Sequence, residues 1–163
     1  TDAKCHLPGS TPNRNRQGAL GRETYAAHSD FFDRSISAAG IRTLLSHIAS
    51  VRGGSGSIAL TALGGAVNRV SPTATAFVHR RSRMLAQYLA SWRAGTTGTA
   101  AQSWLNGTHD AMRPYASGAA YQNYTDPTLK DWRKAYYGDA VTKLTKVKRQ
   151  YDPEGFFSYP QSL

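Results

Sequence analysis

The sequence predicts an α+β fold, in which helices cover one face of an antiparallel sheet and a helix-and-tail segment follows at the carboxyl terminus. Two observations support this prediction. Segments with strand character and segments with helical periodicity are interspersed along the 163 residues. The strand segments come in hairpin-like sets separated by short turns that contain Gly or Pro, which favours antiparallel pairing.

The first helix is predicted to begin after Ser37, which can cap it, and to end at Gly53-Gly54. Its apolar residues recur at helical spacing and form one stripe. The stripe consists of Ile41, Leu44, Leu45, Ile48 and Val51. Residues 1–22 before it are rich in Pro, Gly, Asn and Arg and are expected to be irregular.

Short β-rich runs follow at 57–63, 67–70 and 74–79, and each is predicted to be a strand. Gly64-Gly65 and Ser71-Pro72 separate them. Residues 83–92 fit the strand and helix periods about equally well. We predict a strand, because the Arg-rich step before it resembles a hairpin turn.

Helical spacing returns at residues 99–115, where Pro114 is expected to close the helix. Residues 121–125 are predicted to be extended, and Asp126 is the expected N-cap of a helix that starts at Pro127.

The inner face of that helix is formed by Trp132, Ala135 and Tyr136, and Gly138 interrupts it. A second helix is expected at 139–150, with Leu144 and Val147 turned inward, followed by a turn at 152–155.

The chain has 20 Lys and Arg against 10 Asp and Glu, a net charge of +10, which biases its surface toward anionic partners. The basic residues are scattered, and the denser group at 143–149 is explained by a solvated helix face. We therefore expect no nucleic-acid partner. One cysteine, Cys5, rules out an internal disulfide, and Cys5-His6 has no second pair at a metal spacing, so no metal site is predicted.

A composition with 40% hydrophobic and 10% aromatic residues is that of a folded domain with one core. No apolar run approaches the roughly 18 residues that span a bilayer, so we expect no membrane partner. The chain begins at Thr1 without an initiator Met. We therefore expect a processed product or a piece of a longer protein.

The last third of the chain carries specific residues in a fixed order. These are Tyr121, Asn123 and Tyr124, then Trp132, Tyr136-Tyr137-Gly138, Lys148, Tyr151-Asp152-Pro153 and Pro160-Gln161. This order resembles the carboxyl-terminal segment of the berberine bridge enzyme family of FAD-linked oxidases. The stretch His28-Ser29-Asp30 before the first helix resembles the substrate-binding domain of that family. We accordingly divide the chain into a partial substrate-binding-type domain, 1–115, and the family's carboxyl-terminal segment, 116–163.

The resemblance implies an oxidoreductase in which hydride passes from a hydroxyl or amine substrate to FAD, with oxygen as the acceptor. The family's FAD-binding domain lies mainly upstream and is not in this sequence. The implied partners are therefore an FAD-binding domain or chain and a small-molecule substrate. Because flavin chemistry needs the cofactor, the chain alone is expected not to turn over. A stand-alone binding module of the same fold, without flavin, that holds an anionic ligand stays open as the alternative.

By resemblance, Tyr124 is the base that removes a hydroxyl proton from the substrate. A tyrosine has an ordinary pKa of about 10, so this role needs a donor or cation nearby, and Arg69 and Arg113 could supply one. The alternative for Tyr124 is a core tyrosine with its hydroxyl tied to the backbone. On an extended segment Gln122 shares a side with Tyr124, which makes Gln122 the expected substrate contact.

The resemblance also places three residues near the flavin: Asn123, Tyr159 and Gln161. For Asn123, a structural role that ties its strand to the tail at 160–161 is the alternative.

Overall fold

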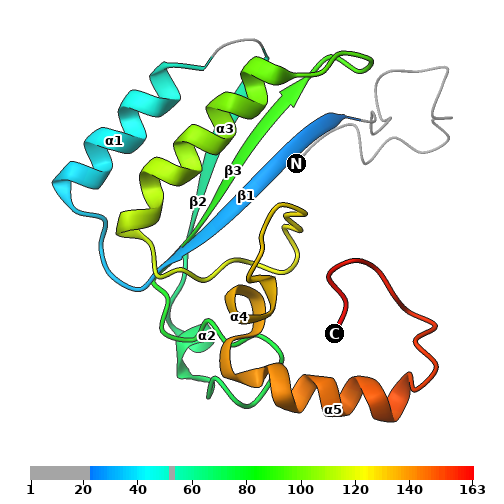
Figure 1. Ribbon diagram of the computed structural model, residues 1–163. Helices are drawn as coiled ribbons and strands as arrows, with labels where there is room; N and C mark the ends of the chain where they lie inside the picture. The colour runs from blue at the N-terminus through cyan, green and yellow to red at the C-terminus, as the bar shows by residue number, and fades with distance from the viewer. Residues whose placement is uncertain (1–22, 52–53) are drawn as a thin grey trace, which may run out of the picture.

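The computed structural model describes residues 23–51 and 54–163, so the predictions for 1–22 and for Gly53 lie outside the described residues (Figure 1). A three-stranded antiparallel sheet carries α1 and α3 on one face. This confirms the predicted α+β class. The elements in chain order are β1 (Thr24–Phe32), α1 (Ala38–Ala49), β2 (Ser55–Ala62), α2 (Ala66–Arg69), β3 (Met84–Trp92), α3 (Thr99–Met112), the 3₁₀ turn η2 (Arg113–Tyr115), α4 (Trp132–Tyr137), the 3₁₀ turn η3 (Gly138–Ala140) and α5 (Val141–Tyr151).

The strand order is β1-β3-β2, so β3 is central and β1 and β2 are the edges. Tyr88 of β3 lies between His28 of β1 and Ile58 of β2 in the register. Residues on this side of the sheet pack under α3 and form the main core. Its buried members are Phe32, Ala86, Tyr88, Ala90, Ala101, Trp104, Leu105 and Met112. β1 had no assignment from the sequence, whereas the predicted β3 and α3 are confirmed.

Ser37 caps α1 as predicted, because its hydroxyl accepts a hydrogen bond of 3.2 Å from the backbone N–H of Gly40. The apolar stripe is divided. Leu44, Ile48 and Val51 pack against the core, but Ile41 and Leu45 are exposed. The reason is position: α1 lies over the edge strand β2 and against α3, so one side of its stripe extends beyond the sheet.

The strands predicted at 67–70 and 74–79 are wrong. The first is the short helix α2, and the second is an irregular loop. The guanidinium of Arg80 explains how this stretch is held without a sheet partner. It donates to the carbonyl oxygens of Phe77 at 3.0 Å and Val67 at 3.1 Å, and to the hydroxyl of Thr75 at 2.8 Å.

The segment at 117–119 runs along the free edge of β1. The backbone N–H of Ser117 donates to the carbonyl of Phe31 at 2.8 Å, and Phe31 N–H donates to the carbonyl of Ala119 at 3.1 Å. The extended structure predicted at 121–125 is wrong, since Tyr124 N–H donates back to the carbonyl of Tyr121 at 2.9 Å and closes a turn.

Asp126 is not a helix N-cap, because α4 begins only at Trp132. The Asp126 carboxylate instead accepts from the backbone N–H of Thr128 at 2.8 Å, a local turn that takes the place of the first helical turn. The predicted inner face is confirmed: Trp132, Ala135 and Tyr136 are buried in a second, smaller cluster with Ala120.

The second carboxyl-terminal helix is α5, and the predicted turn after it is present, with Gly155 N–H donating to the carbonyl of Asp152 at 3.2 Å. Leu144 is half-buried, but Val147 is exposed, so the inward orientation predicted for it is wrong. The chain ends in a tail that returns toward α4 (Figure 1). Among the helices in the described ranges, none is long and apolar enough to cross a membrane.

Candidate functional site

The turn at residues 121–126, called the tyrosine turn below, is fixed at both ends to consecutive residues of β1. At one end, the backbone N–H of Tyr121 donates to the hydroxyl of Ser29 at 2.9 Å. At the other end, Nδ1 of His28 lies 2.6 Å from Oδ2 of Asp126. Neighbouring strand residues point to opposite faces, and β1 is an edge strand, so the tyrosine turn wraps around the free edge of the sheet.

Asp126 is buried and uses all of its polar groups. Its backbone N–H donates to the hydroxyl of Tyr136 at 2.9 Å, and its carbonyl accepts from Nε2 of Gln161 at 2.7 Å. Its carboxylate binds His28 and Thr128. Burial alone would raise the pKa of Asp126, but the hydrogen bonds from His28 and Thr128 outweigh it and hold the pKa below 3.8. Asp126 is therefore a carboxylate at neutral pH.

The tyrosine turn carries both side chains that the predicted chemistry needs, Tyr124 and Gln122. Tyr124 is half-buried, with its ring edge-on to Tyr121 at 5.1 Å. Within the described residues its hydroxyl has no hydrogen-bond partner, so it is not the core tyrosine of the alternative interpretation. Gln122 presents a buried side-chain carbonyl oxygen that likewise lacks a partner among those residues. Because the segment is a turn, the strand alternation that paired Gln122 with Tyr124 does not apply.

The three residues expected near a flavin differ in their surroundings. Asn123 is exposed, and its amide donates to the hydroxyl of Tyr121 at 3.0 Å, so the alternative role that tied Asn123 to the tail is wrong. Gln161 makes that tie instead. It is buried, it binds Asp126, and its Oε1 accepts from Tyr136 at 3.3 Å. Tyr159 is exposed and lies beside Tyr137, whose pKa is raised first by burial and then by this neighbour.

Arg113 does not reach the tyrosine turn as a hydrogen-bond partner. Its guanidinium donates to the fully buried carboxylate of Asp30 at 2.7 Å. Nε2 of His109 lies 3.5 Å from the other carboxylate oxygen. The hydroxyl of Tyr88 shares this environment, and burial followed by the charge of Asp30 raises its pKa. These groups form a polar layer between the sheet and α3 rather than a cation site for Tyr124.

Sequence reasoning missed the roles of His28 and Ser29, and that of Asn106, whose Oδ1 lies 2.9 Å from Nε2 of His28. In the sequence, His28 and Ser29 belong only to the family pattern, and nothing singles out Asn106. One sequence feature could have indicated the role of His28. His28 and Asp30 are polar residues two positions apart, directly before the aromatic pair Phe31-Phe32. On a strand, that spacing places both on one face.

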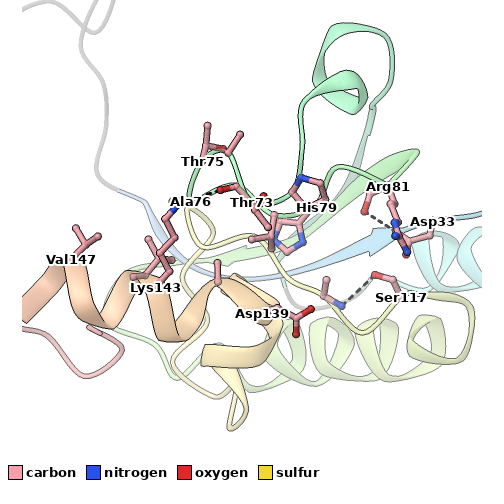
Figure 2. A pocket seen from close by; sticks show the side chains of 18 residues that line it. Asp33, Thr73, Thr75, Ala76, His79, Arg81, Ser117, Asp139, Lys143 and Val147 are labelled. Carbon is pink, nitrogen blue, oxygen red and sulfur yellow. Dashed lines mark hydrogen bonds between the residues drawn. The ribbon is translucent and has the colours of Figure 1, made fainter.

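A cavity of about 590 Å³ lies between the loop at 72–82, the segment at 117–119 and the start of α5 (Figure 2). None of the five predicted site residues lines it. His79 does: its Nε2 binds the carbonyl of Tyr136 at 3.1 Å, and its ring stacks on Phe31 at 4.0 Å. Burial lowers the pKa of His79 to about 4, so the ring is neutral at pH 7. The described residues contain no group of three or more His, Cys, Asp or Glu that could hold a metal ion.

Comparison with known proteins gives one family model, berberine and berberine like, which matches residues 120–163. The chain is 31% identical over 133 residues to the uncharacterized FAD-linked oxidoreductase YgaK of Bacillus subtilis, covering 82% of this chain and 29% of that protein. It is 33% identical over 100 residues to the FAD-linked oxidoreductase YvdP of the same bacterium, covering 61% of this chain and 22% of the relative. The chain thus spans less than a third of the length of these curated relatives.

Solved structures agree in fold. The BBE-like 1 protein of Physcomitrella patens superposes with a TM-score of 0.79 and 30% identity, over 92% of this chain and 32% of that one. Berberine bridge enzyme from Eschscholzia californica gives a TM-score of 0.81, over 91% of this chain and 34% of the enzyme's chain. Its sequence identity is 23%, so this likeness shows the fold alone.

Proposed function

We propose, because this chain belongs to the berberine bridge enzyme-like family of FAD-linked oxidoreductases, that it is the substrate-binding and carboxyl-terminal part of an FAD-dependent oxidase. Its substrate is a small molecule with a hydroxyl or amine to be oxidised, and oxygen is the final acceptor. The chain covers 29% of its relative YgaK. We infer that the flavin is held mainly by a domain or chain outside these residues, as the relatives' greater length suggests.

The observation that carries this proposal is the tyrosine turn. It is pinned at both ends, yet it leaves the hydroxyl of Tyr124 and the buried carbonyl oxygen of Gln122 without partners among the described residues. Buried polar atoms in proteins are nearly always hydrogen-bonded, so an unpaired one in the same turn as a phenol without a partner fits a ligand-binding position. The residues present therefore fit a flavin and a substrate that approach this turn.

In the proposed reaction, Tyr124 acts as its phenolate, and the phenolate oxygen takes the proton from the substrate's hydroxyl or amine and becomes the neutral phenol. FAD, when bound, supplies the acceptor for the hydride that leaves the adjacent carbon. Gln122 accepts a hydrogen bond from the substrate and orients it. Positioned proton transfer of this kind contributes about 10²- to 10⁴-fold in rate.

Contacts to the flavin fall to exposed side chains of the same segment. Asn123 and Tyr159 are accessible and are the proposed contacts. Gln161 was expected to join them, but both ends of its amide are engaged inside the chain. We propose that Gln161 serves the cofactor by keeping the tyrosine turn in place.

The test is Tyr124→Phe in the complete flavoprotein that contains this chain. Turnover is expected to fall about 100-fold or more, with the flavin absorption and the circular dichroism unchanged. Tyr151→Phe, at an exposed tyrosine of α5, is the matched control and should keep normal turnover. Near-normal turnover of Tyr124→Phe would remove this residue from the chemistry.

The second function, a flavin-free module that holds an anionic ligand, is favoured by the net charge of +10. It predicts a colourless protein that gains no visible absorption with added FAD. It also predicts binding to polyanions that weakens steadily with salt.

A further inference from the structure

Both ring nitrogens of His28 face oxygen atoms. Nδ1 lies 2.6 Å from Oδ2 of Asp126, and Nε2 lies 2.9 Å from Oδ1 of Asn106. A neutral imidazole has one N–H and can satisfy only one of two acceptors, whereas an imidazolium donates from both nitrogens. The geometry at His28 is therefore that of a charged ring held between a carboxylate and an amide oxygen.

The surroundings of His28 favour a positive charge. The groups that face or influence it are Asp30 on β1, Tyr88 on β3, His109 and Asp110 on α3, Arg113 on η2 and Asp126 in the tyrosine turn. Arg113 is paired with Asp30, and His109 stacks on His28 at 4.6 Å. Burial alone would lower the pKa of His28, but its hydrogen bonds with Asp126 and Asn106 and the nearby carboxylates raise it above 6.5.

Asp126 is connected mainly to its own segment. Its other hydrogen bonds go to Thr128, Leu129, Tyr136 and Gln161, all within the last 40 residues. Among the hydrogen bonds that Asp126 makes in the described ranges, the one to His28 alone reaches the sheet. Tyr124 lies two residues before Asp126, so this bond fixes the end of the turn nearest to the proposed base.

We propose that His28 is a positioning residue, which as an imidazolium holds Asp126, and with it the turn that carries Tyr124, against the edge of β1. Ser29 holds the opposite end through Tyr121, so two consecutive strand residues define the place of the turn. The role in catalysis rests on the proposed function of Tyr124. The role in ordering the turn does not.

The proposal gives the tether a pH range. His28 has a raised pKa, so its contribution is complete below 6.5 and is lost as the pH rises through the folded-state value. Asp126 has a lowered pKa, so its contribution is complete above 3.8 and is lost as the pH falls through its own folded-state value. The tether is thus complete between pH 3.8 and 6.5 and weakens on either side.

The first measurement is the protonation of the His28 ring by ¹⁵N NMR of the full chain at pH 6. Two protonated nitrogens are expected, and Asp126→Asn should lower the pKa of His28. A single neutral tautomer at pH 6 would overturn the proposal, and this measurement on the unaltered chain does not depend on whether any variant folds.

The second measurement is amide hydrogen exchange across 121–128 in the full chain at pH 6. His28→Gln should speed exchange there at least about tenfold, the scale of losing a charge-assisted hydrogen bond, while β3 and α3 stay protected. His28→Lys keeps a cation for Asp126 and should recover part of the protection. The control is His47→Gln. His47 lies in α1 and its Nδ1 is 3.2 Å from the hydroxyl of Thr108 in α3, so this variant should leave exchange in the turn unchanged. Equal exchange in His28→Gln and the unaltered chain would overturn the proposal.

In the complete flavoprotein, His28→Gln should lower kcat about 10- to 100-fold at pH 6 without loss of bound flavin. The reason is that Tyr124 would no longer be held in the position from which it takes the substrate's proton. The deficit should shrink above the pKa of His28, where the unaltered protein also loses the tether. If Tyr124→Phe turns over normally while the exchange result holds, the proposed base is wrong and the positioning of the turn stands. If exchange is unchanged, the positioning is wrong whatever Tyr124 does.

Discussion

The core under α3 and the cluster around α4 are held together in different ways. The first joins eight buried hydrophobic residues from two strands and a helix, and the second joins four within one short stretch. In the second region, hydrogen bonds that converge on Asp126 carry much of the order. The tail after α5 leaves large aromatic side chains in solvent.

The residues shared with the family model lie in the region with the weaker hydrophobic core, at 120–163. A segment that depends on polar ties can be shaped precisely around a ligand, but it depends on its neighbours for stability.

The largest effect is expected from tryptophan deletion, because each region contains one tryptophan that is 8% exposed. Trp104→Ala should lower the free energy of unfolding by about 4–5 kcal/mol. It leaves a cavity in the main core and removes the hydrogen bond that the indole donates to the carbonyl of His47. Trp132→Ala should cost nearer 3 kcal/mol, because its smaller cluster can collapse. Urea unfolding of both variants measures the free energies. Equal losses would mean that the two regions form one cooperative core.

The next effect concerns His79, which joins the regions by stacking on Phe31 of β1 and binding Tyr136 of α4. Its pKa is about 4 in the fold against 6.5 when unfolded, so the unfolded chain binds the extra proton between these values. Stability is therefore complete above pH 6.5 and should fall by about 2–3 kcal/mol as the pH drops to 4.

The measurement is urea unfolding of the unaltered chain and of His79→Gln between pH 4 and 7. The difference between the two curves should change by that amount, with the unaltered chain gaining stability as the pH rises. His28→Gln is a control of opposite sign, because the pKa of His28 is raised. Parallel curves for His79→Gln would contradict a neutral buried ring.

The same contrast explains what the sequence could predict. The helices α1, α3 and α5 follow from periodicity and end signals, since their own residues decide them. The central strand β3 follows from the hairpin-like step before it, because its own residues fit the strand and helix periods equally well. The loop at 74–79 has strand-like residues, but the guanidinium of Arg80 overrides that local preference. Tyr124 was found through a family pattern, and Gln122 through a strand alternation that the turn does not have. The partner of Asp126 could not be found, because His28 lies 98 residues away and only the fold brings them together.

A smaller effect separates two glycines of the first region. A Cβ on Gly56 of β2 would lie 2.7 Å from the ring of Trp104, so Gly56→Ala should cost about 1–3 kcal/mol by overpacking. A Cβ on Gly107 of α3 would meet no atom within 4 Å, and Gly107→Ala should stabilise by about 0.5–1 kcal/mol through helix propensity. Thermal unfolding compares the two variants. A stabilising Gly56→Ala would show that the sheet and α3 pack less tightly than the structure indicates.

The smallest effect on stability, and the sharpest on association, is expected from the tail. Phe156 and Phe157 are 83% and 72% exposed, while their backbone N–H groups bind the carboxylate of Asp152. Replacing both with Ser should change the unfolding free energy of this chain by less than about 0.5 kcal/mol, because little apolar surface is buried there. If these rings dock on the proposed flavin domain, the variant should bind that domain at least about tenfold more weakly in a titration.

Deleting 156–163 would confuse the two effects, because it also removes the buried Gln161 that holds Asp126. Replacing the exposed Leu45 of α1 with Ser is the control for a lost surface hydrophobe in the first region, and it should leave association unchanged. Unchanged association in the double variant would mean that the exposed aromatic rings of the tail play no part in docking.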